Sequence, residues 1–152
     1  MRISLNGWHF DVDITRTMIH SLEATQDHCT CGYCRNFYRV IDATFGSIKG
    51  FLARFGVNIE GPEMLLPLEP TVYFAAYRVL GRVLQKGMIP LTVDGIPLRI
   101  DEQGDSFLIC AGPMELPWVI EEAMEDVVSP VNEPEVFWEM FDYFLPDAVL
   151  DS

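Results

Sequence analysis

The sequence has no long apolar run, no basic residue after Arg99 and no familiar catalytic motif. No stretch approaches the roughly 20 apolar residues that a helix needs to cross a bilayer, so we expect no membrane-spanning segment. It contains no glycine-rich phosphate loop, nucleophile elbow or His-Glu-x-x-His pattern, so nothing favours the enzyme classes that depend on them. The N-terminal residues lack an apolar segment and a small-residue cleavage site, which predicts no secretory signal and a cytoplasmic location.

Charge is distributed unevenly along the chain. Residues 1–99 contain ten Lys and Arg against nine Asp and Glu, whereas residues 100–152 contain fourteen acids and no Lys, Arg or His. The two parts therefore carry +1 and −14, which together make the net charge of −13. Such a field repels nucleic acid and anionic membranes, so we expect neither as a partner. It favours a basic protein partner for residues 100–152, or serves solubility alone.

The length and composition indicate a folded domain. A chain of 152 residues suits a single domain over 1–152. Hydrophobic residues make up 49% of it and aromatic residues 12%, which argues against a disordered or fibrous protein.

The N-terminal residues predict a hairpin followed by a helix. Apolar residues alternate over 2–14 around Asn6-Gly7, the strongest short-range signal for a two-residue hairpin turn. A short amphipathic helix capped by Asp13 or Thr15 is expected next. Its apolar residues are Met18, Ile19 and Leu22.

The strongest helical pattern follows the cysteine cluster. Apolar residues recur there at spacings of three and four, on one stripe of a helix. These residues are Phe37, Ile41, Phe45, Ile48, Leu52 and Phe55. Gly46 and Gly50 lie inside the pattern, so a break into two helices near Phe45-Gly46-Ser47 is expected. Gly56 is suited to end the second.

The middle of the chain predicts strands. Three prolines make residues 61–70 an extended connection rather than a helix or a central strand. Residues 71–84 alternate and are rich in Val, Tyr and Phe, which favours a long strand over the rival helix. A second hairpin is expected around Asp94-Gly95 and another strand at 106–111, and any central strand must end by Pro117.

The C-terminal part predicts a docked helix between Pro134 and Pro146. Its apolar face consists of Val136, Phe137, Met140, Phe141 and Phe144. The expected fold class is therefore α+β, with a mainly antiparallel sheet built from hairpins. The core helix after the cysteine cluster would cover the sheet, and the C-terminal helix would pack on the core helix.

Three of the four cysteines lie within six positions, at Cys29, Cys31 and Cys34. In a reducing compartment such a cluster is more often a metal site, a redox pair or plain core thiols than a disulfide framework. Zinc needs four ligands, so His28, His20 or Cys110 would have to complete the set, and we take His28 as the fourth candidate ligand. A reactive thiolate at a helix N-terminus is the redox alternative. Thiols that cap the helix and fill the core are the structural alternative.

Arg35 and Asn36 follow the cluster directly. We expect them to fix the loop by hydrogen bonds or to pair with an acid of the C-terminal third, and either role is structural.

Several blocks of sequence resemble one protein family. They are Cys-x-Cys-x-x-Cys-Arg-Asn-Phe (29–37), Phe-Leu-x-x-Phe-Gly-Val-Asn (51–58), Glu-x-Pro-Glu (60–63), Tyr-x-x-x-Tyr-x-x-x-Gly (73–81) and Glu-Leu-Pro-Trp-Val (115–119). Together they resemble a family of small uncharacterised bacterial proteins, mostly from Gram-positive lineages. The resemblance implies a shared fold and carries no activity.

Three functional hypotheses follow. The first is a small acidic cytoplasmic binding protein without catalysis, in which residues 100–152 meet a basic partner. The second is a zinc-binding or thiol-dependent enzyme centred on the cysteine and histidine cluster at 28–34. The third is a homo-oligomer that pairs through an exposed edge of the strand at 71–84.

Overall fold

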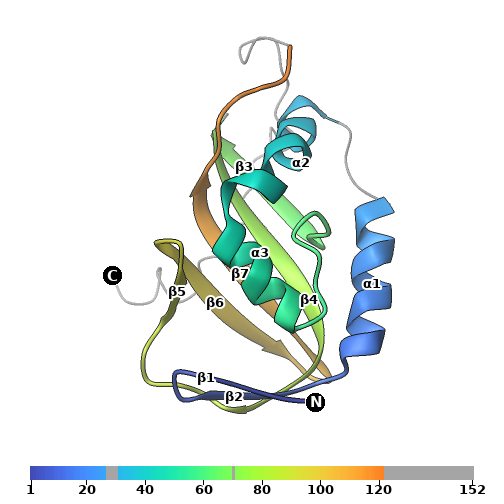
Figure 1. Cartoon of the computed structure of the whole chain (residues 1–152), viewed down its shortest axis with the longest axis vertical. Helices are drawn as coiled ribbons and strands as arrows, with labels where there is room; N and C mark the ends of the chain where they lie inside the picture. Colours follow the sequence, from blue (N-terminus) through green and yellow to red (C-terminus); the bar gives the residue numbers. More distant parts are fainter. Residues whose placement is uncertain (27–30, 70, 122–152) are drawn as a thin grey trace.

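The computed structural model describes residues 1–26, 31–69 and 71–121, which form an α+β fold with an antiparallel sheet, as predicted (Figure 1). The described helices are α1 (Ile14–Gln26), α2 (Gly32–Thr44) and α3 (Gly46–Arg54). The described strands are β1 (Arg2–Leu5), β2 (Trp8–Val12), β3 (Met64–Glu69), β4 (Val72–Gln85), β5 (Leu91–Val93), β6 (Ile96–Gln103) and β7 (Ser106–Glu115). None of these helices combines the length and apolar character that a membrane crossing requires.

Both predicted two-residue hairpin turns are confirmed. Asn6 and Gly7 join β1 to β2 with φ angles of 48° and 86°, and Asp94 and Gly95 join β5 to β6 with φ angles of 55° and 74°. Two successive positive φ angles give the turn a twist that matches the flanking strands, and Asn-Gly and Asp-Gly tolerate them best.

The sheet runs in the order β1-β2-β4-β7-β6-β5, with β3 as a further neighbour of β4. Strand β4 is the longest and lies inside the sheet. It pairs with β7 on one side, and on the other side with β3 near its start and with β2 near its end. The edge predicted to be exposed along 71–84 is paired over most of its length, since β7 pairs with residues 72–80 and, on the other side, β3 pairs with 72–76 and β2 with 81–85. Pairing of two copies through this strand stays a prediction.

The proline-rich residues 61–70, predicted as an extended connection, contain an outer strand. Strand β3 pairs with β4 through Met64 to Glu69 and includes Pro67. An outer strand tolerates a proline because one row of its N–H groups points away from the sheet. The register shifts between Pro67 and Glu69, beside the proline.

Helices α2 and α3 pack on one face of the sheet, which we call the first face. The main buried cluster joins them to the strands through Tyr33, Phe37, Ile41, Ile48, Leu52, Tyr73, Tyr77, Ile109 and Phe107. The break predicted near Phe45 is confirmed, since α2 ends at Thr44 and α3 begins at Gly46.

The first turn of α3 is capped from a distant part of the chain. Phe45 occupies the N-cap position and makes no side-chain hydrogen bond to the helix. Instead, the Asp94 carboxylate in the β5–β6 turn accepts hydrogen bonds from the backbone N–H groups of Ser47 and Ile48, each at 3.1 Å. The hairpin turn therefore satisfies two donors that the helix itself leaves unpaired.

The other face of the sheet, which we call the second face, carries a smaller apolar cluster. It consists of Leu66, Phe74, Ala76, Leu108 and Cys110, with Met64 packed against them. The predicted C-terminal helix at 136–144, and its packing on the core helix, lie outside the described residues.

Candidate functional site

The cysteine cluster lies at the start of α2. Cys31 is the N-cap residue, and its Sγ accepts a hydrogen bond from the backbone N–H of Cys34 at 3.4 Å. Cys34 is buried and Cys31 is half-buried. His28 and Cys29 lie outside the described residues. Of the four predicted zinc ligands, the structure thus places Cys31 and Cys34 in one turn.

The two other candidates for a further ligand are engaged elsewhere. Cys110 packs in the second-face cluster, whereas Tyr33 and Phe37 of α2 belong to the first-face cluster, so the sheet separates Cys110 from the head of α2. The Nε2 of His20 lies 3.3 Å from a carboxylate oxygen of Glu63. Over the part of the chain that the structure describes, no group of three or more His, Cys, Asp and Glu could hold a metal ion.

Asn36 ties α2 to the chain that leaves the sheet. Its side chain is fully buried. Its Nδ2 donates to the Pro117 carbonyl at 3.0 Å, and its Oδ1 accepts from the Val119 N–H at 2.8 Å. The expected hydrogen-bonding role of Asn36 is confirmed, and its partners are backbone groups rather than an acid.

Helix α1 faces the protein with its polar side. Thr17 and Ser21 are buried. The Thr17 hydroxyl donates to the Asp13 carbonyl at 2.7 Å and accepts from the Leu80 N–H at 3.0 Å. The Ser21 hydroxyl accepts from the Asn58 N–H at 2.8 Å. These bonds supply partners for backbone donors beside the helix.

Close backbone contact explains why small residues face inward on α1. A Cβ atom added at Gly61 would lie 2.7 Å from the Ser21 carbonyl oxygen, and one at Gly56 would lie 2.8 Å from the Ile14 carbonyl oxygen. The chain after α3 therefore approaches α1 too closely for large side chains between them. The helix begins as predicted, since the Asp13 carboxylate accepts from the Arg16 N–H at 3.0 Å.

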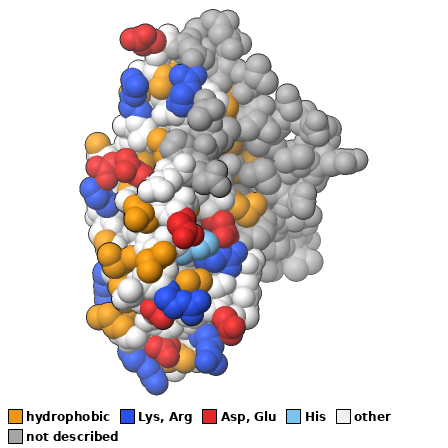
Figure 2. All heavy atoms as spheres, turned by 90° about the vertical axis from the view of Figure 1, so that its right-hand side faces the viewer, with side chains coloured by type: hydrophobic (Ala, Val, Ile, Leu, Met, Phe, Trp, Pro, Cys, Tyr) orange, Lys and Arg blue, Asp and Glu red, His pale blue; other side chains and the backbone are white. Residues whose placement is uncertain are grey.

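Three large apolar residues of α1 are exposed, whereas Ile14 packs against the main buried cluster. Met18, Ile19 and Leu22 are 57%, 56% and 58% exposed, and we call this set the α1 apolar face. Hydrophobic side chains gather on the side of the molecule where α1 lies, with charged side chains around them (Figure 2). An amphipathic helix usually buries its apolar stripe, so the orientation is the reverse of the usual one.

A charged network borders α1. The Arg78 guanidinium donates to both carboxylate oxygens of Glu63 at distances of 2.6–2.8 Å, and also to Ser106 and Gln103. Burial alone would raise the pKa of Glu63, but the hydrogen bond and charge of Arg78, with a smaller effect of His20, outweigh it and lower the pKa. The Glu63 carboxylate therefore stays ionised at a lower pH than an ordinary glutamate.

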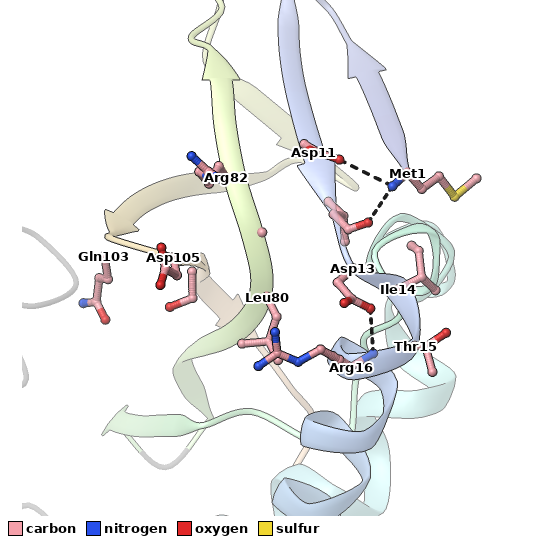
Figure 3. A pocket seen from close by; sticks show the side chains of 13 residues that line it. Met1, Asp11, Asp13, Ile14, Thr15, Arg16, Leu80, Arg82, Gln103 and Asp105 are labelled. Carbon is pink, nitrogen blue, oxygen red and sulfur yellow. Dashed lines mark hydrogen bonds and ion pairs between the residues drawn. The ribbon is translucent and has the colours of Figure 1, made fainter.

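An open groove of about 1040 Å³ begins at the N-terminus of α1 (Figure 3). Three carboxylates, Asp11, Asp13 and Asp105, and two guanidinium groups, Arg16 and Arg82, line it. The terminal amine of Met1 lies 3.4 Å from Asp11 and donates to the Val12 carbonyl at 2.8 Å. The positive and negative groups balance, so the groove favours neither cations nor anions.

Sequence reasoning missed the orientation of α1. The available signal was the pair Thr17 and Ser21, four residues apart on the same helix face, together with Gly56 and Gly61 later in the chain. Small residues on a helix and glycines on its neighbour permit close backbone approach.

Comparison with protein-family models, with curated proteins and with solved structures finds no match for this chain. The resemblance to a family of small bacterial proteins stays a prediction, and functional inference depends on the geometry.

Proposed function

We propose that the protein is a small binding protein without catalysis, which holds a protein partner against the α1 apolar face. The observation that carries this proposal is the inverted helix, with Thr17 and Ser21 buried and Met18, Ile19 and Leu22 exposed. Three large apolar side chains on one helix are thus more than half exposed to water. Covering the exposed part of these side chains would contribute roughly 1–2 kcal/mol each before the costs of association are subtracted.

The surroundings of the α1 apolar face suit a protein interface. Such interfaces place apolar groups at the centre and charged groups at the rim. On α1 itself Arg16 and Glu23 are exposed and His20 is partly exposed, and the partly exposed Glu63 lies beside His20. The rim thus offers charges of both signs around an apolar centre.

A basic partner fits the overall charge. The described residues hold ten bases and thirteen acids, a net charge of −3. Residues 122–152 hold nine acids and no base, and Asp27 supplies the remaining acid. Most of the attraction for a basic protein would therefore come from residues 122–152, and it would be screened beyond about 10 Å at 0.1 M salt.

The test is capture of a partner by matched variants. Proteins retained by the wild-type chain are identified, purified and titrated against Ile19→Asp and Leu22→Asp, with Glu23→Gln as the control on the same helix. We expect at least about a tenfold loss of affinity in the two Asp variants and little change in the control, because burying an unpaired charge is costly. Since all three positions are exposed, unfolding free energies should stay within about 0.5 kcal/mol of wild type.

Two outcomes would contradict this proposal. Equal binding by wild type and both Asp variants would remove the α1 apolar face as the docking surface. Binding that is unchanged at high salt would remove the electrostatic contribution of the acidic residues.

A zinc-binding or thiol-dependent protein is the second candidate. It is supported by the position of Cys31 at the N-terminus of α2, where the helix dipole favours a thiolate. Elemental analysis of protein purified under reducing conditions should then find one zinc per chain, lost in Cys31→Ser, with Cys29, Cys34 and His28 as the other predicted ligands. If the protein contains no metal and its thiols react no faster than free cysteine, this candidate function is wrong.

A further inference from the structure

Cys31 and Cys34 lie in the first turn of α2. The Cys31 carbonyl accepts a helical hydrogen bond from the Arg35 N–H at 2.9 Å, and the Cys31 Sγ accepts one from the Cys34 N–H at 3.4 Å. Positions three apart on an α-helix place their Cα atoms about 5 Å apart. Disulfides join Cα atoms that are about 4.4–6.8 Å apart. The helix therefore holds the two cysteines at a separation that a disulfide can bridge.

Contacts from distant parts of the chain hold the turn between the two cysteines. The Tyr73 hydroxyl of β4 donates to the Tyr33 carbonyl at 2.9 Å, and the Tyr33 ring makes an edge contact with Trp118, with 5.8 Å between the ring centroids. Burial is the main reason why the pKa of Tyr73 is raised to about 12, and the charges of Cys34 and Cys31 add to the rise. Both thiols thus lie near the same hydroxyl, and the sheet fixes the turn that carries them.

The two thiols differ in their access to solvent. Cys31 is half-buried, whereas Cys34 is only 3% exposed. A reagent in solution therefore meets the Cys31 sulfur first, and Cys34 can react with a group that Cys31 has already bound. This division suits thiol–disulfide exchange, which proceeds through a mixed disulfide.

Cys110 cannot compete for either thiol. It packs with Leu66, Phe74 and Leu108 on the second face, so the sheet lies between it and the head of α2. Within the described residues, Cys31 and Cys34 are therefore each other's nearest thiols. Cys29 lies outside the described residues, and the experiment removes it by substitution.

We propose that Cys31 and Cys34 form a dithiol that closes reversibly to a disulfide by exchange with a small disulfide such as oxidised glutathione. The Cys31 sulfur attacks one sulfur of oxidised glutathione, whose S–S bond breaks, and the first glutathione leaves with the Cys31 proton. The Cys34 sulfur then attacks the Cys31 sulfur of the mixed disulfide, and the second glutathione leaves with the Cys34 proton. The protein thus gives up two electrons and two protons, and oxidised glutathione becomes two molecules of reduced glutathione.

The inference rests on the same two thiols as the second candidate function, but the disulfide needs no metal and neither His28 nor Cys29. It does not depend on the partner proposed for the α1 apolar face, which lies on a different element. The reaction gives the head of α2 an oxidised and a reduced form, next to the point where Asn36 holds the chain that leaves the sheet.

The test detects a disulfide across a single cleavage site in the full-length protein. Cys29→Ser is equilibrated with mixtures of reduced and oxidised glutathione and quenched in acid, and its remaining thiols are blocked with N-ethylmaleimide. Chymotrypsin cuts the denatured chain after Tyr33, between the two cysteines, so only a disulfide keeps the two fragments joined. We expect joined fragments to be at least about tenfold more abundant in Cys29→Ser, and in the control Cys29→Ser/Cys110→Ser, than in Cys29→Ser/Cys31→Ser.

Three outcomes would overturn the proposal. The first is equal amounts of joined fragments with and without Cys31. The second is a disulfide in wild type that tandem mass spectrometry assigns to Cys29. The third is one zinc per chain in wild type with every thiol still reduced, which would leave the second candidate function standing. A disulfide between Cys31 and Cys34 in protein without zinc would support the proposal and count against that candidate.

The order of the two steps has its own readout. Cys29→Ser/Cys34→Ser lacks the second thiol, so the mixed disulfide of Cys31 with glutathione should accumulate. In Cys29→Ser/Cys31→Ser the buried Cys34 should take up glutathione at least about tenfold more slowly. Equal rates in the two folded variants would overturn the role given to Cys31. If loss of Cys34 prevents folding, the fragments of Cys29→Ser alone decide whether the disulfide forms.

Discussion

Replacing Asn36 with Ala should destabilise the protein by about 2 kcal/mol. The substitution removes at least two hydrogen bonds, from Nδ2 to the Pro117 carbonyl and from the Val119 N–H to Oδ1, and a further one to the Tyr73 side chain. Each such bond contributes roughly 1 kcal/mol, and more if its partner is left buried without water. Both bonds are partly buried, so about 1 kcal/mol each is the lower estimate of their contribution.

The assay is urea denaturation of Asn36→Ala beside Arg39→Ala, an exposed position on the same helix that should change stability by less than about 0.5 kcal/mol.

Asn36→Asp provides a second check. It keeps the acceptor for Val119 but places a charge in a fully buried position, so its pKa should be raised by burial. Because the folded pKa then exceeds the unfolded one, the Asp variant should gain stability relative to wild type as the pH falls. If Asn36→Ala lowers the free energy of unfolding by less than about 0.5 kcal/mol, as a surface substitution would, the reasoning is refuted.

Three further predictions concern the sheet and its border. Tyr77→Phe should cost about 1 kcal/mol in urea denaturation, because the buried hydroxyl donates to the Ile59 carbonyl at 2.8 Å; an unchanged midpoint would contradict this. Gly81→Ala should lower the melting temperature far more than Gly50→Ala, since an added methyl group would overlap the Asp11 carbonyl oxygen, whereas a methyl group at Gly50 meets nothing within 4 Å. Glu63→Gln should be less stable than wild type at neutral pH, with the difference fading as the pH falls through the lowered pKa of Glu63. A pH-independent difference would show that Glu63 acts through packing rather than charge.

Local sequence signals predicted the turns and strands well, because short-range chemistry determines them. Asn6-Gly7 and Asp94-Gly95 tolerate the positive φ angles of their turns whatever surrounds them. The long strand and the break at Phe45 were likewise visible as periodicity and a glycine. The prolines of residues 61–70 correctly excluded a helix and a central strand, but they did not show that β3 would pair with β4 as an outer strand.

The candidate site was harder to predict because it depends on distant contacts. The pattern at Met18, Ile19 and Leu22 indicates a helix but not which side of it meets the protein. That side is decided by Gly56 and Gly61, which approach α1 from the chain after α3. Similarly, Cys110 was a reasonable fourth ligand until its place on the second face separated it from Cys31.

The cap that Asp94 supplies to α3 also bears on the order of folding. Helix α3 has nine residues and contains two glycines, so it is too short to be stable alone. Two of its N-terminal donors find their acceptor only when a turn about 46 residues later has formed and come into place. We therefore expect α3 to become protected from hydrogen exchange together with the β5–β6 hairpin rather than before it. Such long-range contacts slow folding and make the domain open as one unit.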